Sequence, residues 1–369
     1  MKNEITFGQF LVGEAHPPLV FAEVGSYFNG DLKLAKDLVQ RIIAIFSQVS
    51  HQPAVLKTEI LSNSDICIPS ALNETYCDKE GHIKVENYRA LIERKCMSLE
   101  HYAQLFELLR QSKVPFIVSV YDFEAADFAK AQGASSLKIA SANVVHIPLI
   151  RHVARLGLPM VIDTGRATLA EVFTAVDTAR KAGCQAIIVQ HSPDGHPALP
   201  EAHNLRILET YQQCFGVPVG LSDHYKGVEM LYAAIALGAV VLEKGIYTDP
   251  NELDQDIVHA MGIDQLESVL HKVYDVWQAL GNYHRDMSQP IKGVIGSSQR
   301  QCLVAKKDLK SGDKINYETI RFAFPCLGIP VEKWDMIEGC RINKPIKANQ
   351  PLTWDHLYHS HASKLSCVD

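Results

Sequence analysis

Eight short apolar segments, separated by stretches of helical period, constrain the fold of this chain more than any other feature. Parallel strands that are buried on both faces have this nearly continuous apolar character. The segments are residues 19–24, 54–57, 115–120, 136–140, 159–163, 186–190, 217–221 and 239–243. Between them, segments such as 31–46 and 169–182 carry apolar residues at helical spacing. Strand alternating with helix predicts parallel strands joined by right-handed crossovers.

Polar side chains recur at the carboxyl ends of the predicted strands. They are Ser119, Lys138, Ser141, Thr164, Ser222 and His224. In a closed barrel all strand ends open on the same face, so these groups would share one pocket. A doubly wound open sheet usually stops at about six strands and, when it binds dinucleotides, has a Gly-rich turn after its first strand. Residues 23–26 (EVGS) are not such a turn. We therefore predict an α/β chain with a (β/α)8 TIM barrel.

The length of 369 residues exceeds that of a barrel of about 250 residues, which leaves room for a small second domain. From about residue 297 the pattern changes to short β-like pieces at 301–305, 320–324 and 341–345, and residues 305–312 echo 342–349. We predict a barrel over residues 1–285, a linker over 286–299 and a β-clip domain over 300–369. The polar excursion 61–96 is longer than a normal βα loop, so we expect it to shape the pocket.

Composition limits the partners of the chain. The net charge of −6 argues against a nucleic-acid partner, which would favour a basic face. The nine cysteines form no CxxC pair, so we expect reduced thiols that pack as small hydrophobes. Neither an apolar leader nor a membrane span of about 18 apolar residues is present in the sequence. We expect a cytoplasmic protein without a membrane partner.

Five segments together resemble the sialic acid (N-acetylneuraminate) synthase family. They are residues 21–25 (FAEVG), 138–141 (KIAS), 163–168 (DTGRAT), 217–224 (VPVGLSDH) and 234–244 (AIALGAVVLEK). Residues 325–329 (PCLGI) and 351–355 (PLTWD) resemble the antifreeze-like (SAF) domain of the same family. The shared order and spacing of these pieces carry the resemblance. It implies a homodimer in which the SAF domain of one subunit caps the barrel of the other.

The resemblance implies a condensation of phosphoenolpyruvate with the open-chain aldehyde of an amino sugar. C3 of the enol attacks the aldehyde, water adds at C2, and phosphate leaves. Lys57 and Lys138 match family contacts that neutralise the phosphate and the carboxylate of phosphoenolpyruvate, and Ser119, Ser141 and Ser222 match its hydrogen-bond donors. Ser119 stands where the family usually has Thr. Solvated lysines and ordinary turn serines are the structural alternative.

Glu23 ends the first predicted strand and is our candidate for the group that moves protons. A purely structural ion pair with a neighbouring lysine is the alternative for this carboxylate. His191, after the sixth strand, is a further candidate for lining the pocket or for a structural role. The predicted catalytic residues are Glu23, Lys138 and His224.

The metal site departs from the family pattern. Two family histidines hold a divalent ion that polarises the aldehyde; the first matches His224, but Gly245 stands at the place of the second. Glu243 and Asp256 match acidic positions near that ion, and His259 follows shortly after. We therefore predict a possible Mn²⁺ or Mg²⁺ site at His224, Glu243 and Asp256, with a structural role for His224 as the alternative.

The positions that match sugar contacts differ further from the family. The substrate-binding candidates on this side are Glu59, Asn143, Thr164, Arg166, Asp194, His196 and Phe324. Glu59 replaces Gln, Asn143 replaces Glu, and Phe324 replaces an Arg that reaches toward the acyl group of the sugar. Losing a planar guanidinium changes what the site can recognise. We predict an acceptor other than N-acetylmannosamine; drift in tolerant loops is the alternative.

Two other functions stay open from the sequence. Lys57, Lys138 or Lys244 can form a Schiff base with a carbonyl substrate, which would make the protein an imine-forming aldolase. The missing histidine and arginine are also compatible with a non-catalytic protein that binds sugar acids. We favour a transferase that forms C–C bonds, because an anion site, a candidate base at Glu23 and an electrophilic group at His224 occur together.

Overall fold

The computed structural model describes residues 4–282 and 300–357. The chain divides into two compact units, residues 1–282 and 283–369, and each is described by itself. The predicted linker 286–299 lies outside the described residues. Free thiols are present at Cys67, Cys77, Cys96, Cys184, Cys214, Cys302 and Cys326. No helix in that part is both long and apolar enough to cross a membrane.

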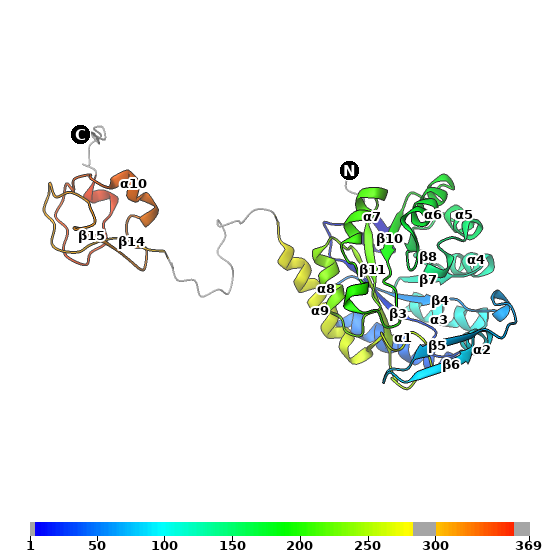
Figure 1. Cartoon of the computed structure of the whole chain (residues 1–369). Helices are drawn as coiled ribbons and strands as arrows, with labels where there is room; N and C mark the ends of the chain where they lie inside the picture. Colours follow the sequence, from blue (N-terminus) through cyan, green and yellow to red (C-terminus); the bar gives the residue numbers. More distant parts are fainter. Residues whose placement is uncertain (1–3, 283–299, 358–369) are drawn as a thin grey trace. The chain divides into compact units, whose positions relative to one another are not determined.

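The first unit is built on eight parallel strands that close into a barrel (Figure 1). Each strand is hydrogen-bonded to its neighbour, and the pairing of β11 with β12 closes the ring. The strands are β3 (Leu19–Val24), β4 (Ala54–Glu59), β7 (Phe116–Val120), β8 (Ser136–Ile139), β9 (Met160–Asp163), β10 (Ile187–His191), β11 (Val219–Ser222) and β12 (Val241–Tyr247). The short β13 (Met261–Gly262) pairs with the end of β12. The predicted (β/α)8 barrel is confirmed.

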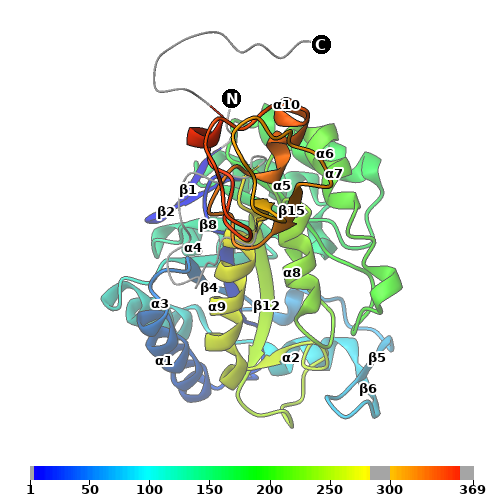
Figure 2. The same ribbon diagram turned by 90° about the vertical axis from the view of Figure 1, so that its left-hand side faces the viewer.

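Helices surround the barrel and connect its strands (Figure 2). They are α1 (Leu32–Gln48), α3 (Leu99–Gln111), α4 (Phe123–Ala131), α5 (Ile147–Arg155), α6 (Leu169–Lys181), α7 (Ile207–Phe215), α8 (Glu229–Ala236) and α9 (Ile263–Leu280). Local sequence fixes their ends: Asp31 caps the first turn of α1, and Thr168 and Glu171 form a capping box at α6. Gly216 ends α7 with a left-handed φ of 59°.

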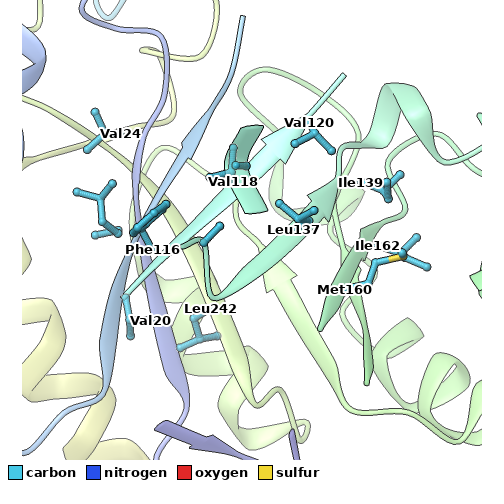
Figure 3. Packing of buried hydrophobic residues seen from close by; sticks show 14 of the residues in the cluster. Val20, Val24, Phe116, Val118, Val120, Leu137, Ile139, Met160, Ile162 and Leu242 are labelled. Atoms are coloured by element: carbon cyan, nitrogen blue, oxygen red, sulfur yellow. The ribbon is translucent and has the colours of Figure 1, made fainter. Parts of the chain in front are cut away.

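The main core lies between the outer face of the strands and the helices. Figure 3 shows side chains of neighbouring strands packed together in this layer, among them Val118, Leu137 and Ile162. Each of these three side chains is 0% exposed. Burying a side chain of this size stabilises the fold by about 1.5–3 kcal/mol. This layer fixes the strands, and with them the groups at their carboxyl ends.

Inside the barrel, the side chains are apolar toward the amino ends of the strands and polar toward their carboxyl ends. The lower layer includes Phe21, Val55, Ile117, Val161, Ile188 and Val241. An antiparallel hairpin of β1 (Ile5–Phe7) and β2 (Phe10–Val12) contributes Phe7 to the same cluster. Side chains two positions apart on a strand share a face, so the next inward positions lie one layer higher. Those positions are Glu23, Lys57, Ser119, Asp163, Gln190 and Glu243.

The excursion after β4 is a small subdomain. It contains a 3₁₀ turn (Ser64–Ile66), the antiparallel pair β5 (Asn73–Cys77) and β6 (Ile83–Asn87), and α2 (Tyr88–Lys95). Lys95 and Asp254 form a buried ion pair at 2.8 Å, which ties α2 to the loop after β12. Glu74, Thr75 and Tyr76 of β5 line the pocket described below, as expected for a long loop at the catalytic face.

The second unit is a small β-rich fold around its own apolar core. The antiparallel strands β14 (Cys302–Ala305) and β15 (Ile320–Ala323) pair with each other, and the unit also contains isolated bridges and the short helix α10 (Trp334–Ile337). The two segments that echo each other pair directly: the backbones of Leu309 and Ile346 exchange hydrogen bonds of 2.9 and 3.0 Å. The predicted third strand at 341–345 is wrong, because only a single bridge at Arg341 forms there.

Candidate active site

One pocket of about 690 Å³ opens at the carboxyl ends of the barrel strands. The predicted site residues that line it are Glu23, Lys57, Glu59, Ser119, Lys138, Ser141, Arg166, Asp194, His196, Ser222, His224, Glu243 and Asp256. They come from strands and loops that are far apart in the sequence. The closed barrel therefore brings most of the sequence-predicted groups to one place.

Two lysines at the base of the pocket are surrounded by carboxylates. The ammonium group of Lys138 lies 2.7 Å from each carboxylate oxygen of Glu243 and 2.8 Å from Oδ2 of Asp163. The ammonium group of Lys57 contacts Glu23 and lies 3.3 Å from Oε1 of Glu243. We name these five residues, Glu23, Lys57, Lys138, Asp163 and Glu243, the lysine–carboxylate cluster. Buried charges need such pairing, because leaving water is costly for an isolated ion.

The carboxylates of this cluster differ in proton affinity. Burial raises the pKa of Glu23 to about 7 and that of Asp163 to about 6, against the opposing charges of Lys57 and Lys138. Burial would also raise the pKa of Glu243, but contact with both ammonium groups lowers it to about 2. Glu243 is thus a permanent anion near neutral pH. Glu23 and Asp163 are the members that can take up a proton when another anion enters.

Serine hydroxyls surround the same space. Ser222 donates to Oε1 of Glu243 at 3.4 Å, and Oγ of Ser141 accepts a hydrogen bond from the backbone N–H of Gly165 at 3.0 Å. The hydroxyls of Ser119 and Ser192 are buried and have no hydrogen-bond partner within the described residues. Buried polar groups are normally satisfied by protein, water or ligand. Both hydroxyls line the pocket, so a bound molecule can satisfy them.

Three histidines gather on another side of the pocket. His196 follows β10, His224 follows β11 and His259 lies in the loop after β12. One ligand nitrogen from each lies within 4.8 Å of the others, so the three form a group that can hold a metal ion. Oδ1 of Asp256 lies 2.9 Å from Nδ1 of His196 and 3.6 Å from Nε2 of His259.

The histidine group favours neutral imidazoles at its centre. Burial and the neighbouring rings of His259 and His196 lower the pKa of His224 well below its usual value. Burial also lowers the pKa of His259. For His196 the effect of burial is outweighed by Asp256, which raises its pKa. Neutral imidazole is the form that binds metals.

Two of the three predicted metal ligands lie together, and the third is engaged elsewhere in the pocket. His224 and Asp256 lie at the histidine group, but both oxygens of Glu243 are engaged by Lys138. At Gly245, the position of the missing family histidine, an added Cβ would lie 2.3 Å from Oη of Tyr27. Tyr27 therefore occupies the space that a side chain at residue 245 would need.

The outer part of the pocket carries the altered sugar-contact positions. Nε of Arg166 donates to Oδ1 of Asp194 at 2.6 Å, and both side chains are largely exposed. Glu59 lies deeper and accepts a hydrogen bond of 2.8 Å from Tyr121. Arg166 adopts a φ of 57°, a left-handed conformation that is uncommon outside glycine. These groups give the entrance both acidic and basic character.

Two of the predicted sugar contacts are not brought into this pocket. Asn143, in the 3₁₀ turn Ser141–Asn143, donates to the carbonyl of Val120 at 3.4 Å, and Thr164 donates to the carbonyl of Gln190 at 3.3 Å. Neither side chain is among the pocket-lining residues. Phe324 belongs to the second unit, where its side chain is 62% exposed.

Two further candidates lie outside the pocket lining. The ring of His191 contacts the carbonyl of His203 at 2.6 Å, which is the structural role considered from the sequence. Lys244 is buried against Asp223 at 2.8 Å. Conversely, sequence reasoning did not single out Asp163, Ser192 or Tyr121 as site residues. The one indication for Asp163 in the sequence was the alternation of side chains along β9. It places Asp163 on the same inward face as Val161, one layer nearer the carboxyl end of the strand.

A closed barrel with a pocket of buried, paired charges at the carboxyl ends of its strands has the arrangement of an enzyme active site. The sequence matches the NeuB family over residues 50–285 and the SAF domain over residues 300–357. Because the first match covers more than half of the chain, the protein belongs to the NeuB family. The predicted relationship to sialic acid synthases with a SAF domain is confirmed, and so is the predicted class of C–C bond-forming transferase.

Relatives of similar length cover nearly the whole chain. It is 25% identical over 352 residues to the N,N'-diacetyllegionaminic acid synthase of Legionella pneumophila, with 94% of this chain and 96% of that protein covered. It is 27% identical over 348 residues to the pseudaminic acid synthase of Helicobacter pylori, with 93% and 99% covered. These relatives share the class of product, a nonulosonic acid, and differ in the sugar.

Solved structures show the same fold. An N-acetylneuraminic acid synthetase from Leptospira borgpetersenii superposes with a TM-score of 0.67 at 24% identity, covering 79% of this chain and 94% of that one. The spore coat polysaccharide biosynthesis protein SpsE of Bacillus subtilis superposes with a TM-score of 0.62 at 22% identity, covering 97% and 100%. At these identities the similarity supports the fold alone.

Proposed function

We propose that this enzyme condenses phosphoenolpyruvate with the open-chain aldehyde of a sugar, and releases phosphate and a 2-keto-3-deoxy sugar acid. One observation carries the proposal: Lys57 and Lys138 are buried at the base of the pocket, and their only ion-pair partners in the described residues are the three carboxylates of the cluster. Charge-assisted hydrogen bonds from ammonium groups suit the phosphate and carboxylate of this substrate.

Entry of a polyanion requires the cluster to give up negative charge. Glu243 stays ionised near neutral pH, whereas Glu23 and Asp163 have raised pKa values of about 7 and about 6. Uptake of a proton by Asp163 on binding weakens its contact with Lys138 and leaves Glu23 ionised. The buried hydroxyls of Ser119 and Ser192, which lack partners in the described residues, supply further donors.

The reaction then balances as follows. C3 of the enol forms a bond to the aldehyde carbon, and the aldehyde oxygen takes a proton to become a hydroxyl. Water adds at C2 and loses a proton, and the bond from C2 to the phosphate oxygen breaks. The second proton of the water leaves with the phosphate as the 2-keto group forms. In this scheme ionised Glu23 accepts one proton from the attacking water and passes it to the aldehyde oxygen, because a pKa of about 7 lets this carboxylate both take up and release a proton near neutral pH.

The histidine group lies in the same pocket and would hold a divalent ion through His196, His224 and His259. Such an ion, when bound, supplies a Lewis acid for the aldehyde oxygen. The chain's own contribution is to bring the three rings together and to place Asp256 beside two of them.

We also propose that the acceptor differs from N-acetylmannosamine. Asp194 and Arg166 present charged groups at the entrance and Glu59 presents one deeper in the pocket, and such groups suit a polar, hydroxyl-rich ligand. The homodimer in which a SAF domain caps the partner's barrel stays a prediction from the family resemblance. The cytoplasmic location stays a prediction as well.

The Schiff-base alternative has less support. An imine-forming lysine must be a neutral amine when it attacks the carbonyl. Carboxylates of the cluster, with Glu59, outweigh burial and raise the pKa of Lys57 well above its usual value. Burial lowers the pKa of Lys244, but this amine is bonded to Asp223 outside the pocket lining.

The decisive experiment is an assay of phosphate release from phosphoenolpyruvate with a panel of aldoses and N-acylated sugars. Mass spectrometry should show one sugar lengthened by three carbons. The Lys57→Met/Lys138→Met variant is the matched control, and it should bind no phosphoenolpyruvate in calorimetry. A borohydride-trapped pyruvate adduct with no phosphate release would support the aldolase instead.

A further inference from the structure

We propose that the metal centre of this chain is formed by His196, His224 and His259, which bind one divalent transition-metal ion through three imidazole nitrogens. This inference deepens the proposed function, since the site faces the same pocket. It differs from the two-histidine arrangement that the family resemblance implies, because one of those two positions is Gly245.

The geometry is that of a ligand set around one ion. Nδ1 of His196 lies 3.2 Å from Nε2 of His259, and Oδ1 of Asp256 lies 2.9 and 3.6 Å from these two atoms. Two ligands on a tetrahedral ion with bonds of 2.0–2.1 Å are about 3.3 Å apart. The ring of His224 completes the group, with its centroid 4.5 Å from that of His259 and 4.6 Å from that of His196.

Hydrogen bonds within the protein do not explain this cluster fully. Nδ1 of His224 and Nδ1 of His259 are buried and have no hydrogen-bond partner within residues 4–282 and 300–357. His259 is 2% exposed. A buried nitrogen without a protein partner is unfavourable unless water or a ligand satisfies it, and an ion in the pocket can satisfy Nδ1 of His224. One shared ion would use a lone pair from each ring.

The substitutions around the site are complementary. The histidine expected at residue 245 is missing, and Oη of Tyr27 lies 2.3 Å from where the Cβ of a side chain there would stand. A histidine stands at residue 196 on a neighbouring loop, and it joins His224 and His259. The chain thus lacks the histidine expected at residue 245, but it has His196 and His259 on neighbouring loops. Together with His224, they form a ligand set at a different position in the pocket.

The donors indicate the class of metal. Imidazole nitrogen suits Zn²⁺, Fe²⁺, Co²⁺ and Ni²⁺, whereas Mg²⁺ prefers oxygen ligands and water. His196 and His224 line the pocket, so a position on the ion remains open toward substrate. Oδ1 of Asp256 faces the same two ligand nitrogens, so this carboxylate is placed to hold the ion together with them. We therefore expect Mg²⁺ to bind far more weakly than Co²⁺ or Zn²⁺.

The test uses the full chain after removal of metal by a chelator. Calorimetry with Zn²⁺, and visible absorption with Co²⁺, should show one ion bound per chain. His259→Ala and His196→Ala should abolish this binding, and Asp256→Asn, which removes a negative charge beside two of the ligand nitrogens, should weaken it. His152→Ala is the matched control. His152 also lies 2.8 Å from an aspartate oxygen, but it belongs to helix α5 and does not line the pocket.

The outcomes separate this inference from the proposed function. His196 is 41% exposed, so His196→Ala should fold even if His259→Ala does not, and circular dichroism checks both. Unchanged Co²⁺ spectra in folded His196→Ala, or absence of Co²⁺ and Zn²⁺ binding in the wild type, would overturn the three-histidine site. Phosphoenolpyruvate is titrated into the same samples. Normal metal binding without phosphoenolpyruvate binding would refute the proposed function and leave the metal site standing.

Discussion

Lys138 and Glu243 meet in the centre of the barrel, where the ammonium group of Lys138 lies 2.7 Å from both carboxylate oxygens of Glu243. They come from β8 and β12, which are four strands apart in either direction around the closed sheet. The pair therefore spans the barrel. Both side chains are 2% exposed, so the pair links opposite walls at the depth where an anion would bind.

Removing Lys138 should lower both stability and substrate affinity. Lys138→Ala leaves Glu243 with only Lys57 as an ion-pair partner among the described residues, and leaves Asp163 with none. Breaking a buried ion pair from one side costs about 3–5 kcal/mol. Urea unfolding should show a loss of this size, and calorimetry should show that phosphoenolpyruvate no longer binds.

A second variant separates the two effects. Lys138→Met/Glu243→Gln removes charge from both partners, so it should recover much of the lost stability without recovering phosphoenolpyruvate binding. Recovery of binding in this double variant would contradict the role of Lys138 as an anion ligand.

Glu23 should impose a pH dependence on stability. Its pKa is raised from 4.5 to about 7, so between these values the folded protein holds a proton that the unfolded chain releases. The free energy of unfolding from this group is therefore highest at the acidic end and falls as pH rises through about 7. Glu23→Gln should flatten this slope between pH 6 and 7.5. An equal slope in both proteins would show that the carboxyl group is not perturbed.

The same group should shape the pH–rate profile. If ionised Glu23 accepts a proton from water, kcat/KM rises with pH and has an inflection near its pKa of about 7. Glu23→Gln should lower kcat by about 10²- to 10⁴-fold and remove the inflection. A profile that falls through the same inflection would assign Glu23 as the acid.

The sequence predicted the barrel strands well because parallel strands are buried on both faces. The run 19–24 coincides with β3, and the period of two explains why Phe21 is in the apolar layer and Glu23 in the polar one. What the sequence could not supply was pairing across the barrel. Lys138 and Asp163 are near in sequence, but the contact of Lys138 with Glu243 depends on closure of the ring.

The histidine group was the larger omission. His196, His224 and His259 come from three separate loops, and their approach depends on loop conformations that residue types do not fix. The prediction from family positions placed His196 among the sugar contacts. The exclusion of a side chain at Gly245 by Tyr27 was equally invisible, because it is a contact between residues 218 positions apart (245 minus 27). Loop contacts of this kind are the part that requires coordinates.

Arg166 should influence the acceptor and leave phosphoenolpyruvate binding unchanged. Its contact with Asp194 lies at the exposed entrance, away from the lysine–carboxylate cluster. Exposed ion pairs contribute little to stability, so Arg166→Ala should melt at nearly the same temperature as the wild type. We expect the KM for the acceptor to rise about 10-fold, which corresponds to about 1.4 kcal/mol, with an unchanged Kd for phosphoenolpyruvate. Arg180→Ala, on helix α6, serves as the control.

A methyl group at residue 245 should be destabilising because of Tyr27. The Cβ of Gly245→Ala would lie 2.3 Å from Oη of Tyr27 and 3.3 Å from its Cζ. Overpacking in a close-packed interior costs about 1–3 kcal/mol. Tyr27→Phe removes the clashing oxygen, which is buried without a partner in the described residues. Gly245→Ala should therefore cost less in the Tyr27→Phe background, and additive effects in urea unfolding would contradict this contact.

The hairpin below the barrel should contribute to its stability from the side opposite the active site. Phe7 is 0% exposed, and its ring centroid lies 6.2 Å from that of Phe21 on β3. Phe7→Ala should lower the free energy of unfolding by about 3–5 kcal/mol, because it removes buried area and leaves a cavity. Leu11→Ala, in the same hairpin but 47% exposed, should change it by less than about 0.5 kcal/mol. Phe21 shares β3 with Glu23. A small effect of Phe7→Ala on the free energy of unfolding would therefore mean that packing in the apolar layer does not support the polar layer next to it.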